Sequence, residues 1–139
     1  MKSTELACVR VVAQHHGMDC LICCLAMLLG TSYEAALLAV SKVKTDMGTE
    51  GLFWTDAIRA AEQLGARLRV RQRYDPADTV GVVDLKPVKP RDPHGSHHAA
   101  FLLRGVIIDP NEPTVWDDYE VYEQANQYKL GAVLTQVAP

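Results

Sequence analysis

The longest uninterrupted apolar segment of the chain runs from Cys20 to Leu29. It is apolar on every face, it lacks β-branched residues except Ile22, and Gly30 follows it. This pattern predicts a fully buried helix that Asp19 caps at the start and the glycine ends. Because the run is far shorter than the roughly 18 to 20 residues that span a bilayer, membrane insertion is not expected.

Two amphipathic segments follow this helix. Thr31 and Glu34 have the spacing of a capping box, which predicts a second helix from Tyr33 to about Lys42. A third helix is predicted to begin at residue 54 or 55 and to end at residues 64–65, where a glycine follows a leucine.

Short apolar or alternating segments in the second half of the chain predict strands. Arg104-Gly105 separates two apolar runs and predicts a hairpin, and a short helix is expected within residues 119–129. Residues 86–95 contain three prolines and are expected to form a surface loop rather than a central strand. The predicted strands are residues 66–72, 80–84, 98–103, 106–109 and 131–137. Helices followed by an antiparallel sheet predict an α+β fold, and 139 residues predict a single domain over residues 1–139.

Charge and cysteine content exclude several classes of protein. A net charge of −3, with both signs spread along the chain, indicates neither nucleic acid nor anionic lipid as a partner. Four alternating arginines are the exception, and a solvated strand face is favoured for them because no aromatics are interleaved: Arg67, Arg69, Arg71 and Arg73. Four cysteines without a secretory signal predict reduced thiols and a cytoplasmic protein. Nothing in the sequence indicates the oligomeric state.

The predicted first helix begins with a cysteine, Cys20. A thiol in the first helical turn meets the positive end of the helix dipole and unpaired backbone N–H groups, which stabilise a thiolate and line an oxyanion site. Cys23 and Cys24 lie one turn further into the apolar run and are expected to be core residues. Cys20 is therefore the candidate nucleophile.

The predicted hairpin selects a histidine for this thiol. If the turn consists of Arg104 and Gly105, facing residues have numbers that sum to 209, so Asp109 shares a sheet face with His98. A three-residue turn would transfer the role to His97. We favour His98 as the base, with Asp109 holding its ring.

Gln14 lies six residues before Cys20, across a turn that contains a glycine. A side-chain amide at this position is a candidate donor to the oxygen that gains charge when the sulfur attacks a carbonyl. Cys20, His98, Asp109 and Gln14 thus cover the nucleophile, the base, its orienting group and the oxyanion donor.

Five parts of the chain resemble the bacteriocin-processing, double-glycine leader peptidases, a branch of the papain-like cysteine peptidases: Gln14, DCLICCLAMLLG (residues 19–30), EGLFWTDAIRAAEQLGARLRV (residues 50–70), His98 and Asp109-Pro110. The resemblance implies a papain-like α+β fold, in which the nucleophile begins a central helix that packs with the other helices on a C-terminal antiparallel sheet. It implies a thiol protease that hydrolyses a peptide or isopeptide bond with a Cys-His-Asp triad and a glutamine-assisted oxyanion hole. No cofactor and no metal are implied, and the substrate is a peptide or protein.

Leu21 departs from the family, which usually has glycine after the nucleophile, and is expected to alter access to the thiol. A catalytically weak module that binds a peptide or protein partner is therefore an alternative. The best-known members are fused to an ATP-driven exporter that this chain does not contain, so a leader peptide is one expected substrate among several.

Other chemistries compete with this interpretation. Cys20, Cys23 and Cys24 with His15 or His16 form a possible zinc site, although a structural zinc normally draws a second ligand pair from elsewhere. A cell-wall amidase also uses a cysteine at a helix start, but the upstream glutamine and the lack of an export signal argue against it. Transamidation and removal of a ubiquitin-like modifier use the same triad and stay open.

Overall fold

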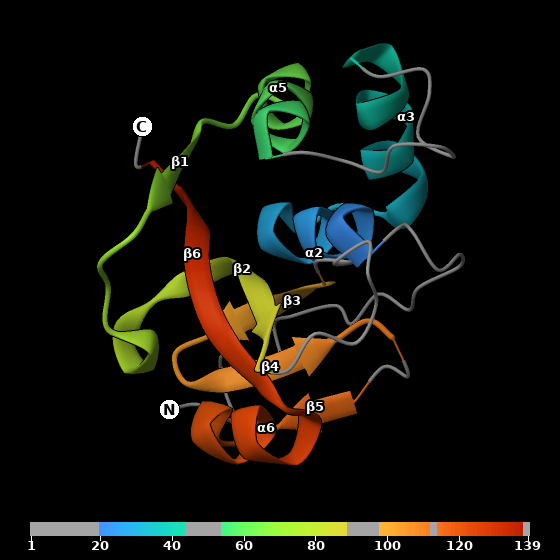
Figure 1. The fold of residues 1–139 in the computed structure, drawn as a ribbon. Helices are drawn as coiled ribbons and strands as arrows, with labels where there is room; N and C mark the ends of the chain where they lie inside the picture. The colour runs from blue at the N-terminus through green and yellow to red at the C-terminus, as the bar shows by residue number, and fades with distance from the viewer. Residues whose placement is uncertain (1–19, 44–53, 89–97, 112–113, 138–139) are drawn as a thin grey trace.

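A computed structural model of the protein describes residues 20–43, 54–88, 98–111 and 114–137. Figure 1 shows a twisted antiparallel sheet with α2, α3 and α5 on one side and α6 on the other. The helices are α2 (Cys20–Leu29), α3 (Tyr33–Val43), α5 (Trp54–Gln63) and α6 (Tyr119–Asn126). The predicted α+β fold is confirmed.

Six strands form the sheet, in the order β1-β6-β2-β3-β4-β5, and every neighbouring pair is antiparallel. Their bounds are β1 (Leu68–Arg71), β2 (Val80–Pro87), β3 (His98–Leu103), β4 (Val106–Asp109), β5 (Thr114–Trp116) and β6 (Tyr128–Gln136). A short 3-10 turn, η1 (Pro76–Asp78), precedes β2. The sequence pattern did not predict β5 or η1, because three-residue elements carry no measurable period.

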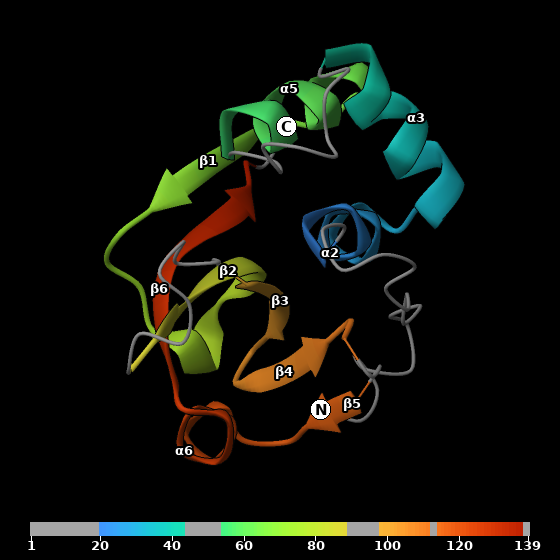
Figure 2. The same ribbon diagram turned by 45° about the vertical axis from the view of Figure 1, so that its right-hand side comes forward.

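The two faces of the sheet carry separate hydrophobic clusters. On one face α2 contributes seven buried residues, Leu21 to Met27, which pack against residues such as Phe101 and Ile108. On the other face Leu102 and Ile107 pack around Tyr122 of α6. The apolar run of α2 is therefore the buried central helix that its composition predicts. Figure 2 shows α2 and α6 on opposite sides of the strands.

No single helix in the described parts of the chain is long and apolar enough to cross a membrane. The helices α2 and α3 meet that test of length and composition as a pair, with a bend of 116° between them.

The β3–β4 hairpin sets the geometry of the candidate site. Arg104 (φ 42°) and Gly105 (φ 86°) form a two-residue turn in which both residues have positive φ, as a type I′ hairpin requires. The partners Phe101 and Ile108, like Leu103 and Val106, have numbers that sum to 209. The two-residue turn predicted from the sequence is confirmed.

The predicted loop over residues 86–95 is wrong at its start. β2 continues through Lys86 and Pro87, which pair with Lys129 and Tyr128 of β6. Among the described residues, the pairing of β2 with β3 ends at Leu85, and Pro87 pairs with β6 alone, which suits a residue that has no backbone N–H to donate to a second strand. Residues 89–95 lie outside the described residues.

The cap of α3 also differs from the prediction. The side-chain oxygen of Ser32, rather than Thr31, accepts a hydrogen bond from the backbone N–H of Ala35 (3.1 Å). Ser32 also accepts the first helical bond through its carbonyl, from Ala36 (3.1 Å). The N-cap thus lies one residue later than predicted, at a serine, which is a better N-cap than threonine. With Ser32 as N-cap the third helical position is Ala35, which cannot complete a capping box.

Candidate active site

Cys20 is the first residue of α2 and is half-buried, whereas the next seven residues of the helix, Leu21 to Met27, are buried. Its position leaves the sulfur at the helix end where backbone N–H groups lack intrahelical partners. Asp19, the expected cap, and Gln14, the expected oxyanion donor, lie outside the described residues.

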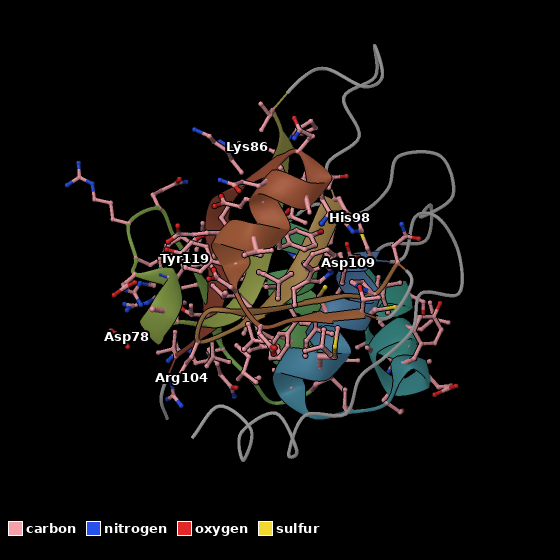
Figure 3. All side chains as sticks on the ribbon, turned by 90° about the horizontal axis from the view of Figure 1, so that it is seen from below. Asp78, Lys86, His98, Arg104, Asp109 and Tyr119 are labelled. Carbon is pink, nitrogen blue, oxygen red and sulfur yellow. The ribbon has the colours of Figure 1, made fainter. Side chains whose placement is uncertain are left out.

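His98 and Asp109 form a close pair at the open end of the hairpin. The Nε2 atom of His98, the first residue of β3, lies 2.7 Å from Oδ1 of Asp109, the last residue of β4. Both side chains are largely buried, with 16% and 12% of their surfaces exposed. Figure 3 shows the two labelled residues next to each other at this end of the sheet. His97, the alternative base, lies outside the described residues.

The imidazole also interacts with the thiol. Burial lowers the pKa of His98, but hydrogen bonds to Asp109 and Cys20, together with the charges of those two groups, raise it to a net value of about 9. Because Nε2 is occupied by Asp109, Nδ1 is the ring nitrogen that remains for the sulfur. Asp109, His98 and Cys20 are thus connected in series, and the ring carries a positive charge at neutral pH.

The three side chains meet from different sides of the sheet. Cys20 belongs to α2, which packs on the face that carries Phe101 and Ile108. His98 and Asp109 have the opposite strand parity, which they share with Leu102 and Ile107 on the α6 face. Both residues lie at strand ends, and the ring of His98 interacts with Cys20 there.

The carboxylate of Asp109 accepts three hydrogen bonds. Oδ1 accepts from Nε2 of His98 and from the backbone N–H of Asn111 (3.0 Å), and Oδ2 accepts from the hydroxyl of Tyr122 (2.6 Å). Burial raises the pKa of Asp109, but the bonds and the charge of His98 outweigh this effect, so the net pKa lies below the usual 3.8. Asp109 is therefore ionised at neutral pH.

Sequence reasoning missed two of these partners. The bond from Asn111 belongs to a turn in which an aspartate accepts from the backbone two residues later, and the turn-forming sequence Asp109-Pro110-Asn111 could have indicated it. Tyr122 lies 13 residues after Asp109 on a separate helix, and no local pattern connects them.

Aromatic rings surround the pair on the α6 face. The ring of His98 stacks on Tyr128 with centroids 6.0 Å apart, and Tyr128 stacks on Tyr122 at 6.4 Å. Trp116 contacts Tyr122 edge-on at 5.5 Å. The contact with Tyr128 covers one face of the imidazole and restrains its orientation.

The neighbouring cysteines are core residues, as predicted. Cys23 and Cys24 are fully buried, and burial raises the pKa of Cys24 well above its usual value. Leu21 is also buried, with 8% of its surface exposed, so its side chain fills interior space beside the candidate nucleophile. Within the described residues, no group of three histidine, cysteine or acidic side chains is arranged to hold a metal ion.

Comparison with known proteins points to one family. The sequence model of the Peptidase C39 family matches residues 8–81, which is more than half of the chain. A search of the curated proteins found no match.

Solved structures of peptidase domains share the fold. A double glycine motif protease from an AMS/PCAT transporter, solved in complex with the leader peptide, is 20% identical, with a TM-score of 0.57 over 92% of this chain and 90% of that chain. The peptidase domain of Streptococcus ComA, a bifunctional ABC transporter, is 15% identical, with a TM-score of 0.59 over 94% and 99%. The ComA peptidase domain of Streptococcus mutans is 17% identical, with a TM-score of 0.53 over 93% and 98%. These similarities confirm the predicted papain-like arrangement of a central helix on an antiparallel sheet.

Proposed function

The chain belongs to the Peptidase C39 family and is a cysteine peptidase, and we propose that Cys20, His98 and Asp109 form its catalytic triad, with Gln14 in the oxyanion hole. The observation that carries the proposal is the series of interactions from Asp109 through the imidazole of His98 to the thiol at the start of α2. Cys20, His98 and Asp109 each interact with the group that the proposed role requires.

In the acylation step the Cys20 sulfur, as a thiolate, attacks the carbonyl carbon of the peptide bond. The electron pair of the carbonyl moves to its oxygen. When the C–N bond breaks, the His98 imidazolium donates its proton to the leaving amine, and an acyl thioester remains on Cys20. Asp109 holds the ring in place through Nε2 and stabilises its positive charge.

In the deacylation step neutral His98 removes a proton from water, which attacks the thioester carbon. The C–S bond then breaks, the carboxylic acid product leaves, and the thiolate and imidazolium are restored. In both steps the backbone N–H of Cys20 and the side-chain amide of Gln14 hold the oxyanion, a contribution of about 10²- to 10³-fold in kcat for one donor.

For the substrate we propose a leader peptide that is cleaved after a double glycine. The support is the fold shared with a double glycine motif protease that was solved in complex with its leader peptide. Two glycines before the scissile bond suit a narrow approach to a half-buried thiol, because a residue without a side chain permits close backbone contact. The cytoplasm, where a thiol stays reduced, is the proposed compartment.

Hydrolysis of synthetic peptides by the purified protein tests this function. We expect cleavage after Gly-Gly, loss of turnover in Cys20→Ala, and a loss of about 10²- to 10³-fold in Gln14→Ala. Cys23→Ala is the matched control, since it removes a sulfur one turn deeper in the same helix, where the side chain is fully buried. Unchanged hydrolysis in Cys20→Ala would refute the nucleophile. Cleavage confined to peptides without the double glycine would refute the substrate and leave the triad in place.

A further inference from the structure

Tyr122 connects α6 to the candidate triad. It is fully buried on the face of the sheet opposite α2, and its hydroxyl donates a hydrogen bond of 2.6 Å to Oδ2 of Asp109. His98 and the Asn111 backbone occupy Oδ1, so Tyr122 is the donor that holds the second oxygen among the described residues. The bond length is that of a hydroxyl donating to an ionised carboxylate, which is one of the stronger classes of hydrogen bond.

We propose that Tyr122 is a positioning residue of the peptidase: its hydroxyl fixes the plane of the Asp109 carboxylate, and thereby the ring of His98 against Cys20. The inference rests on the triad proposed above and extends it by one residue. It assigns α6, which lies across the sheet from the nucleophile helix, a part in the alignment of the reacting groups (Figure 2).

The need for such a residue follows from the conformation of aspartate. The terminal torsion (χ2) of an aspartate side chain has a broad energy minimum, so a carboxylate held through one oxygen can rotate about its Cβ–Cγ bond. Both bonds to Oδ1 lie on the same atom of Asp109, and neither fixes the opposite oxygen. A donor on Oδ2 restricts this rotation of the carboxylate. It thereby fixes the direction of the imidazole, which donates to Oδ1.

Tyr122 itself is held firmly. Its ring stacks on Tyr128 and meets Trp116 edge-on, and Tyr128 in turn stacks on His98. The helix that carries it is capped at its start by Asp118, whose side chain accepts from the backbone N–H of Glu120 (2.8 Å). These contacts restrain the ring of Tyr122, and with it the position of the hydroxyl that donates to Asp109.

A purely structural role is the competing explanation, because a buried hydroxyl needs a partner wherever it lies. Tyr74 supplies the matched control. Its hydroxyl donates a bond of the same length, 2.6 Å, to the backbone carbonyl of Gly131, and its ring packs with the same cluster on the α6 face. This bond involves neither Cys20, His98 nor Asp109, so Tyr74→Phe removes an equivalent bond outside the triad.

The test compares Tyr122→Phe with Tyr74→Phe, each of which deletes one oxygen and retains the ring. For Tyr122→Phe we expect kcat to fall about tenfold to a hundredfold with KM unchanged, by analogy with the loss seen when the hydrogen-bond partners of metal ligands are removed. The acid limb of the kcat profile should move to higher pH, because the bond from Tyr122 helps to keep the Asp109 pKa low. Tyr74→Phe should lower thermal stability without changing kcat or the profile.

A titration that needs no turnover separates this proposal from the proposed function. In wild type and both variants, the pH dependence of the Asp109 carboxyl ¹³C shift reports its pKa by NMR. A rise of about one pH unit in Tyr122→Phe alone supports the positioning role. Equal pKa values in Tyr122→Phe and wild type, or equal losses of kcat in the two tyrosine variants, would overturn it. Peptides left intact by the wild type would count against the proposed function, while the NMR comparison would still decide the role of Tyr122.

Discussion

Asp109→Asn isolates the charge that supports His98. Asparagine keeps the size of the side chain, and its carbonyl oxygen accepts from His98 and from the backbone of Asn111 as the carboxylate does. Its amide donates to the hydroxyl oxygen of Tyr122, which accepts as well as donates. The hydrogen bonds are retained, and the substitution removes the negative charge alone.

The size of the effect follows from the pKa of His98. Its rise from 6.5 to about 9 corresponds, at 1.36 kcal/mol per pH unit, to stabilisation on the order of 3 kcal/mol. Asp109 is the main cause that raises this pKa. We therefore expect Asp109→Asn to lower the free energy of unfolding by about 1 to 3 kcal/mol at pH 6.

The pH dependence gives this expectation its sign. A pKa raised in the folded state contributes stability that is fully present below the unfolded value of 6.5 and is lost as the pH rises through about 9. The deficit of Asp109→Asn should thus be large at pH 6 and shrink toward zero at pH 10.

Urea unfolding at these two pH values measures the deficit, and NMR titration of the His98 ring measures the pKa directly. Asp78→Asn, which removes the same charge from an exposed site in η1, is the control and should change little at either pH. A deficit of equal size at pH 6 and pH 10, or titration of His98 near 6.5 in the wild type, would refute the reasoning.

Three further predictions follow from the same geometry. In a pH–rate profile, kcat/KM should fall as the pH rises through about 9, because His98 then loses the proton that the leaving amine requires; a plateau to pH 10.5 would contradict this. Native iodoacetamide treatment should leave Cys23 and Cys24 unmodified in peptide mass spectra, because both are fully buried and burial raises the pKa of Cys24; labelling of either at the rate of a free thiol would count against their burial. Gly81→Ala should lower the free energy of unfolding by about 1 to 3 kcal/mol, because an added Cβ would overlap the backbone carbonyl oxygen of Leu134 on β6 and lie 2.7 Å from Cγ2 of Val133; an unchanged urea midpoint would contradict this close approach of β2 to β6.

Local rules explain what could be predicted from the sequence. The helix α2 follows from an apolar run that a glycine ends. The β3–β4 hairpin follows from Arg104-Gly105. The number of residues in that turn sets the strand register, which places His98 and Asp109 on one face of the sheet and could be worked out from the sequence. A two-residue turn thus determines which histidine meets the carboxylate.

The missed features depend on distant parts of the chain. Pro87 belongs to β2 because it pairs with Tyr128 of β6, a partner 41 residues away that no local pattern indicates. Tyr122 reaches Asp109 because α6 packs on the far face of the sheet, a result of tertiary packing with no sequence pattern. The N-cap of α3 was predicted one residue too early for a different reason. Thr31 and Ser32 both carry a hydroxyl that can cap a helix, and the structure uses Ser32.

The pairing of sulfur and imidazole is tested most directly by the rate at which iodoacetamide alkylates Cys20 at neutral pH, in the wild type and in His98→Ala. Mass spectrometry assigns the label to Cys20 and requires no knowledge of the substrate. We expect alkylation of the wild type to be at least tenfold faster than that of His98→Ala, because the positive ring stabilises the attacking thiolate. Equal rates in the two proteins would contradict a catalytic partnership between Cys20 and His98.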